Sequence, residues 1–159
     1  MMNQINTDSE FRQAVEALDA VQHRVLAAMF VEHALPLCKY KQLAQILRTA
    51  ADVDASEAEL ALALKSAHAL VIDCHARCGA EGHWSDQAGY FVARAAVAAT
   101  TPLAQSRTGG PAWQAAMSTR MAHTSMLIED QPGEQTTQTE SEWQHRCLTD
   151  YLQELTGSN

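Results

Sequence analysis

Strand signals and aromatic residues are both scarce in this chain of 159 residues. Phe, Trp and Tyr make up 6% of it, no run alternates apolar and polar residues as a strand does, and no Asn-Gly or Asp-Gly hairpin turn occurs. No stretch approaches the roughly 18 apolar residues that a membrane span needs. The first ten residues also lack the basic start and apolar run of a secretory signal. These absences predict a helical protein with no membrane span and no secretory signal.

Positive charge is also in short supply. Eleven Lys and Arg residues face nineteen Asp and Glu residues, which gives a formal net charge of −8. Proteins that bind nucleic acid do so by neutralising phosphates, so we expect no nucleic-acid partner. The balance is compatible with a basic protein partner. The hydrophobic content of 47% excludes a disordered chain and is sufficient for one packed domain over residues 1–159.

Helical periodicity recurs along almost the whole chain and predicts an all-α, antiparallel bundle of six or seven helices. The clearest helix is capped by Ser56 and ends before Gly79. Its apolar stripe advances in steps of four and three and consists of Leu60, Leu64, Ala67, Val71, Cys74 and Cys78. The Thr-Gly-Gly-Pro run at 108–111 is the strongest turn signal, with Pro111 opening a helix that places Trp113 in the core.

Three stretches interrupt this periodicity. Residues 52–55 and 82–86 are predicted loops, and the polar stretch 131–139, which contains Pro and Gly, predicts a flexible linker before the last helix. That helix is too apolar to remain in water; it carries Trp143, Cys147, Leu148, Tyr151, Leu152 and Leu155. It packs either on its own core or on a second copy, so the chain is expected to be a monomer or a homodimer.

Two parts of the chain resemble a known family. The run Leu-Asp-Ala-Val-Gln-His at 18–23, followed by Ala-Ala-Met at 27–29, Glu32-His33 and Pro36, is similar to the N-terminal signature of the YjaG-like bacterial proteins. Residues 93–127, continued by the helix of Glu142 and Trp143, resemble the C-terminal half of that family. The resemblance implies an all-helical, cytoplasmic bacterial protein. Because the family has no established activity, the resemblance implies no catalytic residues.

The sharpest chemical candidate is a cluster of Cys74, His75, Cys78 and His83. Thiolate and imidazole groups are the usual zinc ligands, and residues four apart share a helix face. However, the cluster lacks a Cys-x-x-Cys pair. Its two cysteines also lie on an apolar stripe, where a free cysteine packs as a small hydrophobic residue. Packing is therefore the favoured interpretation of the cysteines, and zinc binding and redox chemistry are the alternatives.

No motif points to catalysis. The chain has no Gly-x-Ser-x-Gly elbow, no phosphate-binding loop and no His-x-x-x-His pair. We therefore expect a protein that is not an enzyme and that needs no cofactor, unless the Cys/His cluster holds zinc.

Acidic residues gather in two segments that suggest a docking face. One comprises Asp52, Asp54, Glu57 and Glu59, and the other begins at Glu129, Asp130 and Glu134. Such a face steers a basic partner and fixes its register. The sequence thus favours a non-catalytic bacterial interaction protein, for which an immunity protein or antitoxin is one concrete form. The alternative is a metal-binding or metal-dependent helical protein that uses the Cys/His cluster.

Overall fold

The computed structural model describes residues 4–77, 84–130 and 137–157, and within these ranges the chain is helical with no β-strand. The α-helices are α1 (Asp8–Glu16), α2 (Ala20–Ala34), α3 (Gln42–Ala51), α4 (Glu57–Arg77), α5 (Trp84–Thr100), α6 (Gly110–Asp130) and α7 (Thr137–Gly157). Two short 3₁₀-helices, η1 (Leu35–Leu37) and η2 (Leu103–Gln105), follow α2 and α5. The predicted all-α helical bundle is confirmed.

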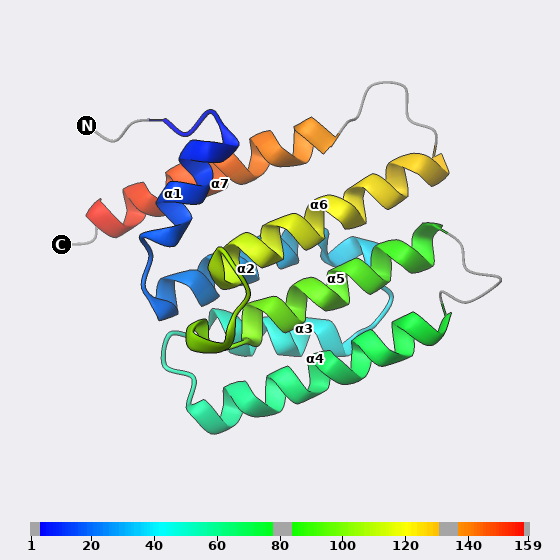
Figure 1. Ribbon diagram of the computed structural model, residues 1–159. Helices are drawn as coiled ribbons and strands as arrows, with labels where there is room; N and C mark the ends of the chain where they lie inside the picture. The colour runs from blue at the N-terminus through cyan, green and yellow to red at the C-terminus, as the bar shows by residue number, and fades with distance from the viewer. Residues whose placement is uncertain (1–3, 78–83, 131–136, 158–159) are drawn as a thin grey trace.

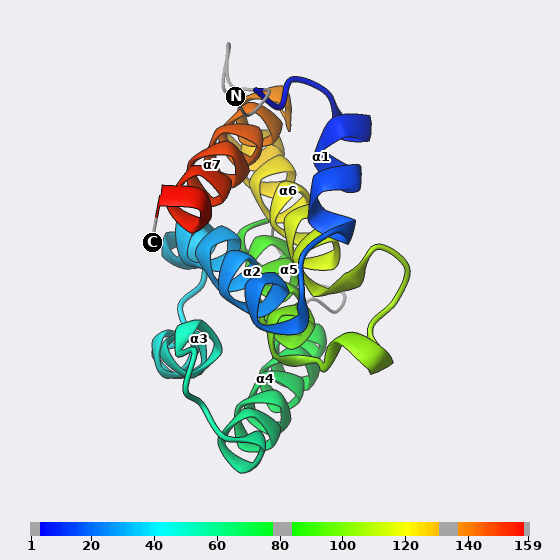
Figure 2. The ribbon, with the colours of Figure 1, turned by 90° about the vertical axis from the view of Figure 1, so that its left-hand side faces the viewer.

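The helices are stacked around α5 and α6. Figure 1 shows α7, α6, α5 and α4 following one another across one face, with α2 and α3 behind them. In the view turned by 90°, α1 lies at the right and α3 at the left, with α2 between them (Figure 2). There α1 packs across both α6 and α7, while α2 packs on α3, α5 and α6. Helix α6 therefore contacts α1, α2, α5 and α7 and is the centre of the fold.

Local side-chain chemistry sets three of the helix starts. Thr7 caps α1 by accepting a hydrogen bond from the backbone N–H of Glu10. Asp19 and Gln22 form a reciprocal capping box at the start of α2. Ser56 accepts from the N–H of Glu59, whose carboxylate accepts in return from the N–H of Ser56. Such caps satisfy backbone donors that the first turn of a helix leaves unpaired.

Alanine makes the centre of the bundle compact. Helices α5 and α6 share the most extensive contact in the molecule. Their buried faces consist largely of small residues: Ala88, Ala93, Ala95, Ala96, Ala99, Ala112, Ala115, Ala116 and Ala122. Small side chains let two helix backbones approach closely, and larger ones fill the space beyond them. Phe11 is the main such filler, with its ring centre 5.9 Å from those of both Phe30 and Trp113.

The turn before α6 requires glycine. Gly109 and Gly110 have φ of 90° and 84°, a region that side chains rarely tolerate. A Cβ atom on Gly110 would also lie 2.6 Å from Cε1 of His23. His23 is buried, and its Nδ1 accepts a hydrogen bond from the N–H of Ala112 in the first turn of α6. Burial lowers the pKa of His23, which keeps its ring neutral and able to accept.

Two predicted boundaries are wrong. Helix α5 begins at Trp84, inside the predicted loop 82–86, and α7 begins at Thr137, inside the predicted linker 131–139. Asp86 and Thr139 fall in those predicted loops because polar residues are typical of loops, but both lie in the first turns of helices, where an acidic side chain such as that of Asp86 is favourable. The remainder of the linker, 131–136, lies outside the described residues.

Helix α7 packs on its own chain. It contacts α1, α2 and α6, with Leu148 fully buried and Tyr151 nearly so. Helix α7 therefore contacts its own core, and the choice between a monomer and a homodimer stays a prediction. None of the described helices combines the length and the apolar character that crossing a bilayer would require.

Candidate metal centre

Three side chains that can ligate a metal meet where α2, α6 and α7 converge. His33 lies in the last turn of α2, His123 in the second half of α6, and Glu140 in the first turn of α7. One ligand atom from each of the three lies within 4.8 Å of the others. The arrangement depends on tertiary packing, because His33 and Glu140 are 107 positions apart in the chain.

The separations suit a small cation. His33 Nδ1 lies 3.2 Å from Glu140 Oε2, and His123 Nε2 lies 3.4 Å from the same oxygen. Two atoms that each bind Zn²⁺ at about 2.0–2.1 Å in tetrahedral geometry are about 3.3–3.4 Å apart. Both histidine-to-carboxylate distances therefore match edges of a zinc coordination tetrahedron.

Glu140 is the most deeply buried member of the group, with 5% of its surface exposed. Burial raises the pKa of its carboxyl group, against the opposing effects of the His33 charge and of hydrogen bonds from His33 and Gln144. A carboxylate in such a place carries a desolvation cost that a bound cation would remove.

His123 presents a ring nitrogen that forms no hydrogen bond with any of the described residues. Its Nε2 is buried, and although it lies near Glu140 it is not aligned to form a hydrogen bond. Burial, reinforced by the charge of His33, lowers the pKa of His123 to about 4. The ring is therefore neutral at pH 7, and a neutral imidazole is the form that binds metals. Buried polar atoms in folded proteins are nearly always hydrogen-bonded or bound to another group, so this nitrogen is available to a further partner such as a metal ion.

The His33 ring is held by stacking. It lies parallel to the Trp143 ring, with centres 3.6 Å apart and planes inclined by 9°. Trp143 is one turn beyond Glu140 on α7, so the same helix supplies both a ligand and the surface that orients another. Fixed ring orientation favours metal binding because less freedom is lost when the ion binds.

A buried polar network supports Glu140 from behind. Gln144 donates from Nε2 to the carbonyl of Ala116 and to Thr119, with a longer contact of 3.4 Å to Glu140 Oε1. Its Oε1 accepts from Nε of Arg120 at 2.7 Å. Groups that orient the ligands in this way affect metal affinity nearly as much as the ligands do.

Arg120 connects this hydrogen-bond network to Asp8 of α1. Its two terminal nitrogens each donate to one carboxylate oxygen of Asp8 at 2.9 Å, and His145 Nε2 lies 2.9 Å from Asp8 Oδ1. The hydrogen bond from Arg120, aided by that from His145 and opposed by partial burial, lowers the pKa of Asp8 to about 2. The first residue of α1 is thus connected through Arg120 and Gln144 to Glu140.

The Cys/His cluster predicted from the sequence is described only in part. Cys74 is buried in the core, and His75 is exposed with its ring centre 5.8 Å from that of Tyr90. Cys78 and His83 lie outside the described residues. The position of Cys74 agrees with packing in the core, and a zinc site built on all four residues stays a prediction.

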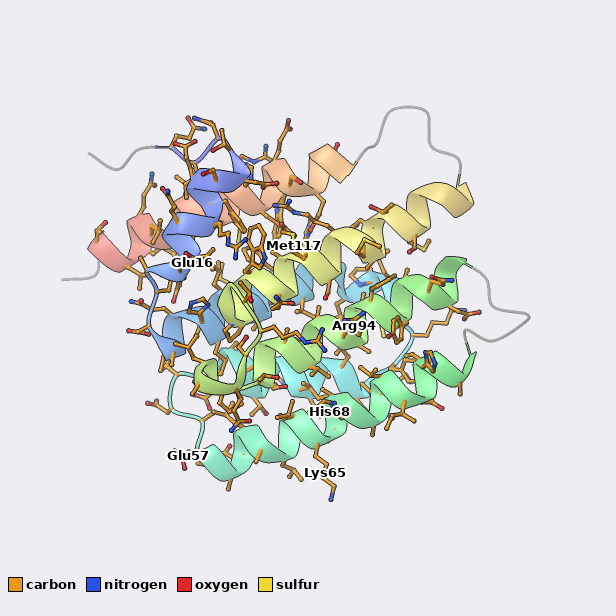
Figure 3. All side chains as sticks on the ribbon, viewed as in Figure 1. Glu16, Glu57, Lys65, His68, Arg94 and Met117 are labelled. Carbon is orange, nitrogen blue, oxygen red and sulfur yellow. The ribbon has the colours of Figure 1, made fainter. Side chains whose placement is uncertain are left out.

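The two acidic segments lie apart. Glu57 marks the start of α4 near one end of the molecule, whereas α6, which contains Glu129 and Asp130, ends at the other (Figure 3). Glu134 lies outside the described residues. In the first segment, Asp52 accepts a hydrogen bond from the N–H of Asp54, and Glu59 completes the cap of α4. An acidic docking face stays a prediction.

Comparisons with known proteins give no relatives. No family model matches the chain, and neither a curated protein nor a solved structure is significantly similar to it. The resemblance to the YjaG-like family is neither supported nor contradicted by these comparisons.

Proposed function

We propose that the protein binds a divalent transition-metal ion, Zn²⁺ in the first instance, through His33, His123 and Glu140. The observation that supports this most strongly is the buried Nε2 of His123, which lacks a hydrogen-bond partner and lies 3.4 Å from a buried carboxylate. Two imidazoles and one carboxylate are a common ligand set for zinc sites with an open position, and also for iron.

A site with three protein ligands leaves room for a further ligand on the metal. Such a position holds water or substrate, and a zinc-bound water molecule is acidified to a pKa of about 7. The proposal therefore agrees with the alternative of a metal-binding or metal-dependent protein raised by the sequence. It differs in the ligands, which are His33, His123 and Glu140 rather than the Cys/His cluster.

Zinc binding is measured by isothermal titration calorimetry at pH 7.5 on metal-free protein. We expect one ion per chain. Replacing His33, His123 or Glu140 by Gln is expected to weaken binding at least about 100-fold, because each change removes one of three ligands. Since the pKa of Glu140 is raised, binding should also release a proton whose amount grows as the pH falls.

Two matched variants distinguish this site from other zinc ligands. His68→Gln alters an exposed histidine on α4 and is expected to leave zinc affinity unchanged. Cys74→Ser is also expected to leave it unchanged, whereas a site on the Cys/His cluster predicts a large loss. Stoichiometric binding that survives all three ligand substitutions would refute the proposal.

A further inference from the structure

A pocket of about 350 Å³ lies on α4, α5 and α6 and does not include the proposed metal ligands. Its polar wall contains His68 of α4, Arg94 of α5 and Arg107 of the segment after η2. Figure 3 shows His68 and Arg94 on neighbouring helices. Val71, Val97 and Ala98 form an apolar wall, and Gln114 and Ser118 of α6 add polar groups.

The charge of this pocket is opposite to that of the chain. No Asp or Glu lines it, although the whole sequence contains nineteen. Neither Arg94 nor Arg107 forms an ion pair within the described residues. By contrast, Arg120 is paired with Asp8, Arg12 with Glu16, and Arg24 donates to two backbone carbonyls.

Both arginines line the same pocket, and each is restrained by a contact of its own or of its segment. The Arg94 guanidinium lies 5.7 Å from the ring centre of Tyr90, and this cation–π contact restrains the side chain. Gln114 of α6 donates a hydrogen bond to the carbonyl of Thr108, the residue after Arg107. This bond fixes the segment that carries Arg107 against α6. Arginine suits phosphate and carboxylate groups because its parallel N–H groups match their oxygens.

We propose that this pocket binds a small organic anion, in which a phosphate or carboxylate group meets Arg94 and Arg107 and a compact apolar body packs on Val71, Val97 and Ala98. The volume is at the lower end of the range for small-molecule sites, which limits the ligand to a small metabolite. This inference is independent of the proposed metal site.

Phenyl phosphate, benzoate and inorganic phosphate serve as probes, titrated by calorimetry at pH 7.5. The titrations use His123→Gln protein in metal-free buffer, so that a bound metal cannot hold the anion. We expect saturable binding of one probe molecule per chain. Stronger binding of phenyl phosphate than of benzoate identifies a phosphate ester as the ligand class, and the reverse order identifies a carboxylate.

Substitutions locate the binding site. Arg94→Gln and Arg107→Gln are each expected to weaken binding about tenfold or more, because each removes a charge-assisted hydrogen bond. Arg48→Gln, an exposed arginine outside the pocket, is the matched control and should leave affinity unchanged. The proposal is overturned if none of the probes binds saturably, or if both pocket variants bind as tightly as the control.

Discussion

Replacing Arg120 with Met should destabilise the protein by about 3 kcal/mol, because the guanidinium is the centre of the buried network. Its side chain is 10% exposed and donates to Gln144 at 2.7 Å and to both oxygens of Asp8 at 2.9 Å. Methionine is similar in length and apolar, so it keeps most of the packing against Phe11 while removing every donor.

The magnitude follows from what each lost contact leaves behind. Gln144 is fully buried, so its oxygen loses a charge-assisted hydrogen bond that contributes about 1.5–3 kcal/mol. The Asp8 side chain is 53% exposed, so water replaces much of the lost pairing and the cost there is about 1 kcal/mol or less. Together these give about 3 kcal/mol, most of it from the buried hydrogen bond to Gln144.

The assay is urea denaturation at pH 7, comparing midpoints at an unchanged slope. Arg48→Met is the control, since this exposed arginine bonds to Gln45 of its own helix, and it should cost less than about 0.5 kcal/mol. In the Arg120 variant, the pKa of Asp8 should also rise from about 2 towards its ordinary value, as followed by NMR. A loss below about 1 kcal/mol for Arg120→Met would show that the hydrogen bonds of Arg120 contribute less to the free energy of unfolding than the structure indicates.

Three further predictions concern pH, backbone conformation and thiol reactivity. Because the pKa of His123 is lowered from 6.5 to about 4, metal-free protein should lose up to about 3 kcal/mol of stability as the pH falls through that range, and His123→Gln should lose less over the same range in urea melts. Gly110→Ala should cost about 2 kcal/mol or more in the same assay, since it combines positive φ with a clash against His23, whereas Gly157→Ala, which meets no neighbour, should change stability by less than about 0.5 kcal/mol. Burial, together with nearby acidic side chains, raises the pKa of Cys147 to about 12, so its alkylation by iodoacetamide at pH 8, followed by mass spectrometry, should be about 1,000-fold slower than that of a free thiol; a rate within tenfold of glutathione would contradict this.

The helices were predictable from the sequence because their signals are local. Thr7, Asp19 and Ser56 cap helices through contacts within three residues of themselves, and Gly109 and Gly110 mark a turn by their own conformation. The prediction failed at 137–139 because a polar run has the same composition in a linker as in the first turn of a helix.

The metal-ligand group had no such local signal. His33 and Glu140 are brought together by the packing of α2 against α7, and Glu140 follows a segment predicted to be a linker. Sequence reasoning about metals depends on regular spacing between ligands, and it therefore selected Cys74, His75, Cys78 and His83. The hydrogen-bond network that supports Glu140 runs through Gln144 and Arg120 to Asp8. It likewise depends on contacts between segments that are distant in the sequence.

X-ray absorption spectroscopy at the zinc edge, on protein loaded with one equivalent of Zn²⁺, tests the central claim most directly. The account predicts a first shell of nitrogen and oxygen atoms at about 2.0–2.1 Å, with outer-shell scattering from two imidazole rings. His123→Gln should reduce the imidazole count to one. A sulfur shell at about 2.3 Å would contradict the account, because it would place the ion on cysteine rather than on His33, His123 and Glu140.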